Sequence, residues 1–175
     1  MTGVQTCALP ILASGETNYM APASARQMAS DLALLPMWYA EAGSAVLAPS
    51  AYNADFLKTK SELLGMDVAL LTEPEVADGK DRKFSPWGWD PALRKRLMTL
   101  GADQTELPSA DYMNILREHS HRLQAVKLLP GLRLNEYFCG ESFYLSTLAE
   151  CNAFVEGREA CLLKAPLSGS GKGLN

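Results

Sequence analysis

The chain has 175 residues, of which 47% are apolar and 21% are charged, a composition typical of a globular protein with one domain or slightly more. No stretch approaches the roughly 18 apolar residues that a membrane-spanning helix requires. With 16 Lys and Arg against 20 Asp and Glu, the formal net charge is -4, so no broad basic face is expected to offset the repulsion of nucleic-acid phosphates. These numbers exclude membranes and nucleic acids as expected partners.

The first eleven residues, MTGVQTCALPI, lack the basic segment and the long apolar stretch of a signal peptide. From Thr2 onward they are identical to the in-frame translation of a common sequencing-library adapter (ACT GGA GTT CAG ACG TGT GCT CTT CCG ATC). We interpret residues 1–11 as an assembly artefact that replaces the first strand of the domain, and we expect the neighbouring strand to be left exposed. The chain stops directly after a glycine-rich loop, so we also expect the native protein to be longer.

The cysteines indicate a cytoplasmic protein with reduced thiols. Without Cys7, three remain, and their spacings match neither a CxxC motif nor a zinc-binding pattern. His119 and His121 lie two positions apart and therefore share no helical face, so a metal site built from Cys and His is not expected. The three remaining cysteines are Cys139, Cys151 and Cys161.

Helix and strand signals alternate after residue 12. A capping-box pattern at Ser24 and Gln27 predicts a helix that is broken or bent at Pro36. The apolar run 44–48 then favours a buried strand, which Pro49 ends.

A second helix and strand follow in the same order. Asn53 can cap a helix that ends at Gly65, and residues 67–71 predict a second buried strand. The inward face of this helix is predicted to carry Phe56, Leu57, Leu63 and Leu64. Alternation of this kind predicts an α/β domain with a parallel sheet over residues 12–117.

The pattern fails over residues 78–89, which are charged and then aromatic, and we predict an exposed loop there. Asp90 followed by Pro91 is a strong helix start, and Gly101 is the matching stop. Trp87 and Trp89 allow two interpretations, stacking on a ligand or packing against the following helix, and the second is the commoner. Three residues near the start of the domain, in the loop after the expected first strand, could help to form a substrate crevice. They are Glu16, Asn18 and Tyr19.

The second module is predicted over residues 118–175. A helical region over 109–129 is interrupted near Ser120, and residues 132–139 are consistent with a strand. Ser142 can cap a helix that Gly157 closes. The apolar run 160–165 then predicts a strand that carries Lys164 and leads directly into a loop rich in serine and glycine.

This last arrangement is chemically specific. Glycines allow several backbone N–H groups to converge on one anion, and Ser168 and Ser170 add hydroxyl donors. Lys164 and Lys172 supply the positive charge that a polyphosphate requires. The loop matches neither the Walker A pattern, because Pro166 and Gly173 stand at two of its defining positions, nor the dinucleotide pattern GxGxxG, whose final spacing is not met.

Residues 160–174, ACLLKAPLSGSGKGL, resemble the strand and glycine-rich loop of the ATP-grasp superfamily, in which a lysine-bearing strand leads into a loop that closes over the phosphates of ATP. Residues 120–129, SHRLQAVKLL, are similar to the helix that opens the ATP-binding module of that family. The resemblance implies an α/β pre-ATP-grasp domain over 12–117, followed by the truncated start of an ATP-grasp nucleotide-binding module over 118–175.

The resemblance also implies a function, that of a ligase which uses ATP and Mg²⁺ to activate a carboxylate as an acyl phosphate. Lys164 would contact an α or β phosphate, and Arg122 would add another phosphate contact. The adenine hinge and the magnesium ligands of the family fall beyond residue 175, so we expect this fragment alone to be inactive. The expected nucleotide-binding residues are Arg122, Lys164, Ser168, Gly169, Ser170, Gly171, Lys172 and Gly173.

The alternative hypothesis is a non-catalytic α/β interaction or regulatory domain that ends in a flexible Ser/Gly tail. In that case Lys164 is a charge on a strand that discourages aggregation, and Arg122 is a solvated helix residue. The two hypotheses differ in one observation, whether the reading frame continues into a strand hinge and a late pair of acidic residues with an Asn.

Overall fold

The computed structural model describes residues 3–6, 15–78, 82–137 and 141–167. The chain divides into two compact units, Met1–Asn114 and Ile115–Asn175, and each is described by itself. The division falls inside helix α4 (Ala110–Ser120), the same helix that contains the first residues of the predicted second module.

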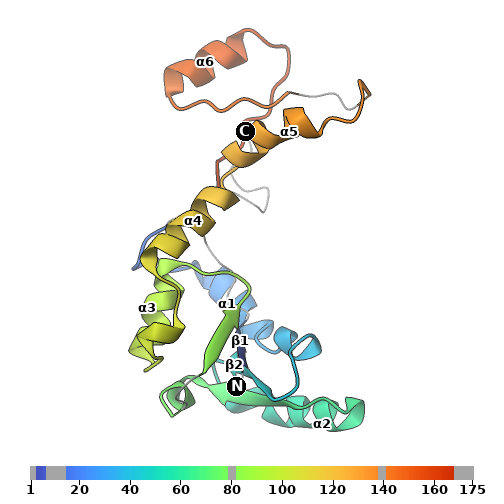
Figure 1. The fold of residues 1–175 in the computed structure, drawn as a ribbon, viewed down its shortest axis with the longest axis vertical. Coiled ribbons are helices and arrows are strands. Elements are labelled where there is room, and N and C mark those ends of the chain that lie inside the picture. The colour runs from blue at the N-terminus through green and yellow to red at the C-terminus, as the bar shows by residue number, and fades with distance from the viewer. Residues whose placement is uncertain (1–2, 7–14, 79–81, 138–140, 168–175) are drawn as a thin grey trace. The chain divides into compact units, whose positions relative to one another are not determined.

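Unit 1 contains a parallel sheet of four strands, β1 (Gly3–Thr6), β2 (Ser44–Ala48), β3 (Val68–Thr72) and β4 (Lys83–Pro86), in the order β3-β2-β1-β4 (Figure 1). The predicted α/β class with a parallel sheet is confirmed for this unit. The strand predicted over 44–48 has the bounds of β2, and the strand predicted over 67–71 begins and ends one residue later as β3.

The strand β1 lies within the residues that we set aside as an adapter sequence. It is central in the sheet, because Val4 pairs with Ala45 of β2 on one side and with Phe84 of β4 on the other. The expectation that a neighbouring strand would be left exposed there is therefore wrong. A parallel ladder is made by backbone groups, so four extended residues can occupy the position whatever their side chains. The adapter interpretation itself stays a prediction.

The strand β4 corrects the loop that we predicted over residues 78–89. Phe84 is the one fully buried residue of this strand, and a single buried side chain gives no alternating pattern from which a strand can be recognised. The strand is short, carries the exposed Lys83 and ends at Pro86, as strands at the edge of a sheet commonly do.

Three helices belong to unit 1. α1 (Ala23–Asp31) begins after Pro22 without a side-chain cap, so the predicted capping box is wrong, and Pro36 lies in the separate 3-10 turn Leu35–Trp38. α2 (Ala54–Leu64) and α3 (Pro91–Thr99) begin and end where the sequence predicted. The Asp90 carboxylate accepts a hydrogen bond from the backbone N–H of Leu93 at 2.8 Å, which satisfies one of the free donors at the start of α3.

Buried side chains form one cluster on each face of the sheet. Met37, Val46, Leu57 and Val68 form the cluster beneath α2. The cluster on the face of α3 comprises Leu71, Val76, Phe84, Leu93, Leu97 and Leu107. Among the predicted inward residues of α2 only Leu57 is buried, because Phe56, Leu63 and Leu64 are 48%, 73% and 53% exposed. The sheet thus has helical cover on both faces, as parallel sheets require.

Unit 2 contains the end of α4, α5 (Leu123–Leu132) and α6 (Leu148–Glu156). The two helical regions on either side of Ser120 are confirmed. The predicted strand over 132–139 is wrong for its described part, because residues 133–137 form no strand. α6 begins after Thr147 and not after Ser142, although it ends before Gly157 as predicted. Residues 160–165 are all described, and the one β-structure among them is an isolated bridge at Lys164. The predicted strand is therefore not formed.

The start of α6 gives a prediction about pH. The pKa of the Glu150 carboxyl lies below its usual value, because the carboxylate accepts hydrogen bonds from the Ser146 N–H at 2.7 Å, the Ser146 hydroxyl at 3.0 Å and the Thr147 N–H at 3.1 Å. A lowered carboxyl pKa stabilises the folded form at pH values above the ordinary Glu value of about 4.3, and this contribution is lost as the pH falls through the folded value.

We therefore expect α6 to lose helical content on acidification below about pH 4, and Glu150→Gln to remove that dependence. The measurement is helical content by circular dichroism between neutral and acid pH. Glu156→Gln, at the other end of α6, is the matched control and should leave the dependence in place. Equal acid dependence in the Glu150→Gln variant would contradict the prediction.

Candidate functional site

Two predicted features of the nucleotide site come together in unit 2. The backbone N–H of Arg122 donates to the carbonyl oxygen of Pro166 at 2.9 Å, and its guanidinium Nε donates to the carbonyl oxygen of Ala165 at 3.1 Å. The bond to Ala165 joins residues 43 positions apart in the sequence. Together the two bonds hold the segment after Lys164, which leads into the Ser/Gly loop, against the first turn of α5.

The first turn of α5 is fixed by His121. Its ring nitrogen Nδ1 accepts a hydrogen bond from the backbone N–H of Leu123 at 3.0 Å, and its carbonyl oxygen accepts one from Gln124 at 2.9 Å. The imidazole also packs edge-on against Tyr144, with ring centroids 5.6 Å apart. Sequence reasoning considered His121 only as a metal ligand and missed this role, since histidine is not among the favoured capping residues.

The structure says less about the remaining predicted site residues. Lys164 is described and its side chain is exposed. The six loop residues lie outside the described residues, so the structure gives no place for Ser168, Gly169, Ser170, Gly171, Lys172 and Gly173. The structure thus describes Arg122 and the neighbouring segment 164–166, but not the loop that follows it.

Arg122, Lys164 and the start of α5 together are suited to binding an anion. The N-terminal end of α5 carries a partial positive charge and lies beside the segment 164–166, although its backbone N–H groups at Arg122, Leu123 and Gln124 already donate to Pro166 and His121. The guanidinium of Arg122 is a planar donor suited to phosphate oxygens, and Lys164 adds a point charge. Both side chains are hydrogen-bond donors without an acceptor, so their expected action is to bind and orient an anion.

Unit 1 has a second candidate position, where the strand order reverses. In the order β3-β2-β1-β4 the connection from β1 leads to β2 on one side, whereas the connection from β3 crosses to β4 on the other side of β1, and ligands of open parallel sheets bind outside the carboxyl ends of the strands at such a point. The Asn18 side chain, in the segment after β1, accepts a hydrogen bond from the Lys95 ammonium of α3 at 2.5 Å. Tyr19 and Glu16 form a backbone turn in the same segment.

The two tryptophans after β4 have different surroundings. Trp89 packs against the buried cluster that contains Leu93 and Leu97, which agrees with the interpretation that it packs against the helix. Trp87 is 56% exposed. Of the two, Trp87 therefore offers the larger surface for a ligand to contact.

No protein-family model, no curated protein and no solved structure matches this chain. In the part of the chain that the structure describes, no three Asp, Glu, His or Cys side chains are grouped as a metal ion would require. Over the same described ranges, no helix has both the length and the hydropathy to cross a membrane. The assignment of a function therefore depends on the contacts described above and on the sequence pattern.

Proposed function

We propose that this chain is part of an ATP-dependent carboxylate ligase of the ATP-grasp type, with unit 1 as the pre-ATP-grasp domain and unit 2 as the start of the nucleotide-binding module. The substrates are ATP and a small-molecule or peptide carboxylate, which is joined to an amine or another nucleophile. The free thiols of Cys151 and Cys161 are in keeping with a cytoplasmic protein.

The observation that carries this proposal is the pair of hydrogen bonds from Arg122 to Ala165 and Pro166. They attach the root of the Ser/Gly loop to the start of a helix, which supports the loop as part of a built site. A flexible tail would need no such attachment. In this proposal the serine and glycine residues after Leu167, which lie outside the described residues, would supply backbone N–H groups to an anion that Arg122 and Lys164 also bind.

The described residues suit the phosphates of ATP but not the metal. Arg122 and Lys164 are cationic donors, and among the described residues no three Asp, Glu, His or Cys side chains are grouped as a metal site would require. When bound, Mg²⁺ would neutralise charge on the transferring phosphoryl group. The part proposed for this chain is to bind and orient the polyphosphate through Arg122 and Lys164.

The carboxylate substrate is proposed to lie at the carboxyl ends of β1 and β4. Lys95 is the cation at this position, and its hydrogen bond to Asn18 holds it toward the segment after β1. The exposed face of Trp87 provides an apolar contact for the rest of the substrate. Unit 1 would then select the acid while unit 2 binds the nucleotide.

The proposal is tested by nucleotide binding to the protein encoded by the complete gene. ATP should raise its thermal midpoint in a concentration-dependent way. Lys164→Ala should weaken ATP binding by roughly 10- to 100-fold, because a hydrogen bond to a charged group contributes about 1.5–3 kcal/mol. Lys127→Ala, which removes the same charge farther along α5, is the matched control and should bind ATP normally.

Unchanged protection by ATP in the Lys164→Ala variant would contradict the assignment of Lys164. Absence of any ATP effect on the intact protein, together with a reading frame that lacks a downstream acidic pair with Asn, would favour the non-catalytic α/β interaction domain instead.

A further inference from the structure

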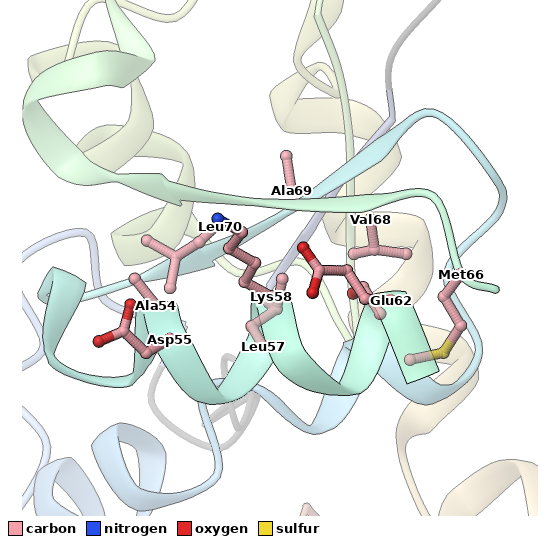
Figure 2. Close-up of a pocket in the computed structure, with 10 residues that line it drawn as sticks. Ala54, Asp55, Leu57, Lys58, Glu62, Met66, Val68, Ala69 and Leu70 are labelled. Atoms are coloured by element: carbon pink, nitrogen blue, oxygen red, sulfur yellow. The ribbon is translucent and has the colours of Figure 1, made fainter. Parts of the chain in front are cut away.

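The cavity of unit 1 and the start of α5 in unit 2 place their polar groups in different settings. The cavity, about 380 Å³ in volume, lies along α2 and β3 (Figure 2). Its charged side chains, Asp55, Lys58 and Glu62, are exposed, and the Ser61 hydroxyl is enclosed without a partner among the described residues. Neither kind of group is arranged to hold a ligand. The His121 imidazole of unit 2, in contrast, belongs to a half-buried residue and accepts a hydrogen bond from the backbone.

The His121 side chain takes part in fixing the backbone at the start of α5. His121 and Arg122 form the two-residue connection between α4 and α5. The peptide group between them is held at both ends, because its carbonyl oxygen accepts from the Gln124 N–H at 2.9 Å and its N–H donates to the Pro166 carbonyl oxygen at 2.9 Å. The next peptide group donates its N–H, that of Leu123, to Nδ1 of His121 at 3.0 Å. Since peptide groups are planar, these bonds restrict both backbone dihedral angles of Arg122.

The hydrogen bond between Leu123 and His121 requires a neutral imidazole. A neutral ring carries one N–H and one acceptor nitrogen, whereas the protonated ring carries two N–H groups and no acceptor. Because Nδ1 accepts, the proton of the neutral ring lies on Nε2. A second proton at Nδ1 would point at the Leu123 N–H, so the protonated ring has to turn away. Its edge-on contact with Tyr144, at 5.6 Å between ring centroids, would then be lost as well.

No described carboxylate holds a proton on this imidazole. The charged or titratable residues at or next to its contacts are Glu118 of α4, Arg122, Tyr144 and Lys164. Glu118 contacts His121 through its carbonyl oxygen, which accepts the His121 N–H at 3.2 Å, and among the described residues no carboxylate forms an ion pair with the ring. The bond with Leu123 is therefore the described contact that separates the neutral form of the ring from the protonated one.

We propose that His121 is a proton-sensitive latch, which holds residues 165–166 against α5 when its imidazole is neutral and releases them when it is protonated. Without its acceptor, the Leu123 N–H can rotate with its peptide group, so the dihedral angles of Arg122 are no longer restricted. The two bonds of Arg122, from its N–H to Pro166 and from its guanidinium Nε to Ala165 at 3.1 Å, then weaken together.

The direction of the pH effect follows from the number of bound protons. The attached form binds one proton fewer than the released form, so attachment is favoured at higher pH and is lost as the pH falls. Histidine changes its charge between about pH 5 and 8, so the segment is held at the upper end of this range and released at the lower end. The latch consists of hydrogen bonds within unit 2 and needs no nucleotide, so it goes beyond the proposed ligase function and does not depend on it.

The test is NMR of the whole chain between about pH 5 and 8. At the upper end of this range, the imidazole nitrogen shifts of His121 should show that the proton is on Nε2. The protection of the Arg122 amide is measured relative to the intrinsic exchange rate at each pH. It should fall roughly 2- to 10-fold from the upper to the lower end, as expected for the loss of one hydrogen bond.

His121→Asn separates the latch from a merely structural role. Asparagine keeps a side-chain oxygen that can accept the N–H two residues on, and it does not titrate, so the protection of the Arg122 amide should stay high over the whole range. His121→Ala removes the acceptor and should give the low protection at every pH. His119→Asn, which removes an exposed imidazole two residues earlier, is the matched control and should keep the pH dependence of the unchanged chain.

The proposal is overturned if the neutral His121 ring carries its proton on Nδ1, or if the protection of the Arg122 amide is constant over the range. It is also overturned if the pH dependence persists in the His121→Asn variant. ATP is absent from all of these measurements, so their failure leaves the proposed function to its own test.

Discussion

Gly101→Ala is expected to destabilise unit 1 by roughly 2–5 kcal/mol. Gly101 has a φ of +91°, a conformation that costs any residue with a Cβ about 1–2 kcal/mol. A Cβ at this position would also lie 2.8 Å from the Cβ and 3.1 Å from the Cα of Ala77. Because the second contact is with backbone, the overlap can be relieved only by moving the chain, and overpacking of this kind adds roughly 1–3 kcal/mol.

Gly65→Ala is the matched control for this prediction. Gly65 also ends a helix with a positive φ, +64°, but a Cβ there would have nothing within 4 Å. It should therefore show the conformational cost alone. The measurement is the free energy of unfolding from urea titration of both variants. Equal losses in the two variants would show that Ala77 does not press against Gly101 in solution.

The same two glycines show what the sequence could predict about the fold. Both were expected to stop helices, because a glycine after an apolar helical face is a local signal, and both do so. The contact between Gly101 and Ala77 carries no local signal, since it depends on how the turn after β3 packs against the end of α3. Helix α3, with Asp90 and Pro91 at its start, was predictable for the same local reason.

Strands could be predicted only where the sequence is apolar along almost the whole strand, as it is in strands that are buried on both faces. β2 and β3 are such runs, whereas β4 has one buried side chain and β1 was set aside because we interpreted residues 1–11 as an adapter sequence. Both of the missed strands are defined by backbone pairing with their neighbours, which no pattern along the chain encodes. In unit 2 the opposite error occurred, because residues 160–165 are apolar but form only one bridge, at Lys164.

The candidate nucleotide site was predictable in its composition but not in its construction. The cationic and glycine residues were recognised from the loop and from the segment that precedes α5. No local pattern indicated that Arg122 would hold residues 165 and 166 through its backbone and its guanidinium, or that His121 would accept a hydrogen bond from the first turn of α5. These contacts join segments that are distant in the sequence, and a single sequence contains no record of such pairs.

Leu97→Ala is the second prediction with a large expected effect. Leu97 is 0% exposed and lies in the cluster that joins α3 to β3 and β4. Removing a buried Leu side chain costs about 2–5 kcal/mol, through the lost transfer free energy and the cavity that remains. Leu63→Ala, at a 73% exposed position, is the control and should change the free energy of unfolding by less than about 0.5 kcal/mol.

Trp89 provides a local reporter for this variant, because it packs against the same cluster, whereas Trp87 is largely exposed. The change in tryptophan fluorescence on unfolding should therefore follow the loss of this cluster, with a lower urea midpoint and an unchanged slope in the Leu97→Ala variant. A loss below about 1 kcal/mol would mean that α3 does not cover this face of the sheet. The position of Lys95 beside the segment after β1, on which the proposed carboxylate site depends, would then have no structural support.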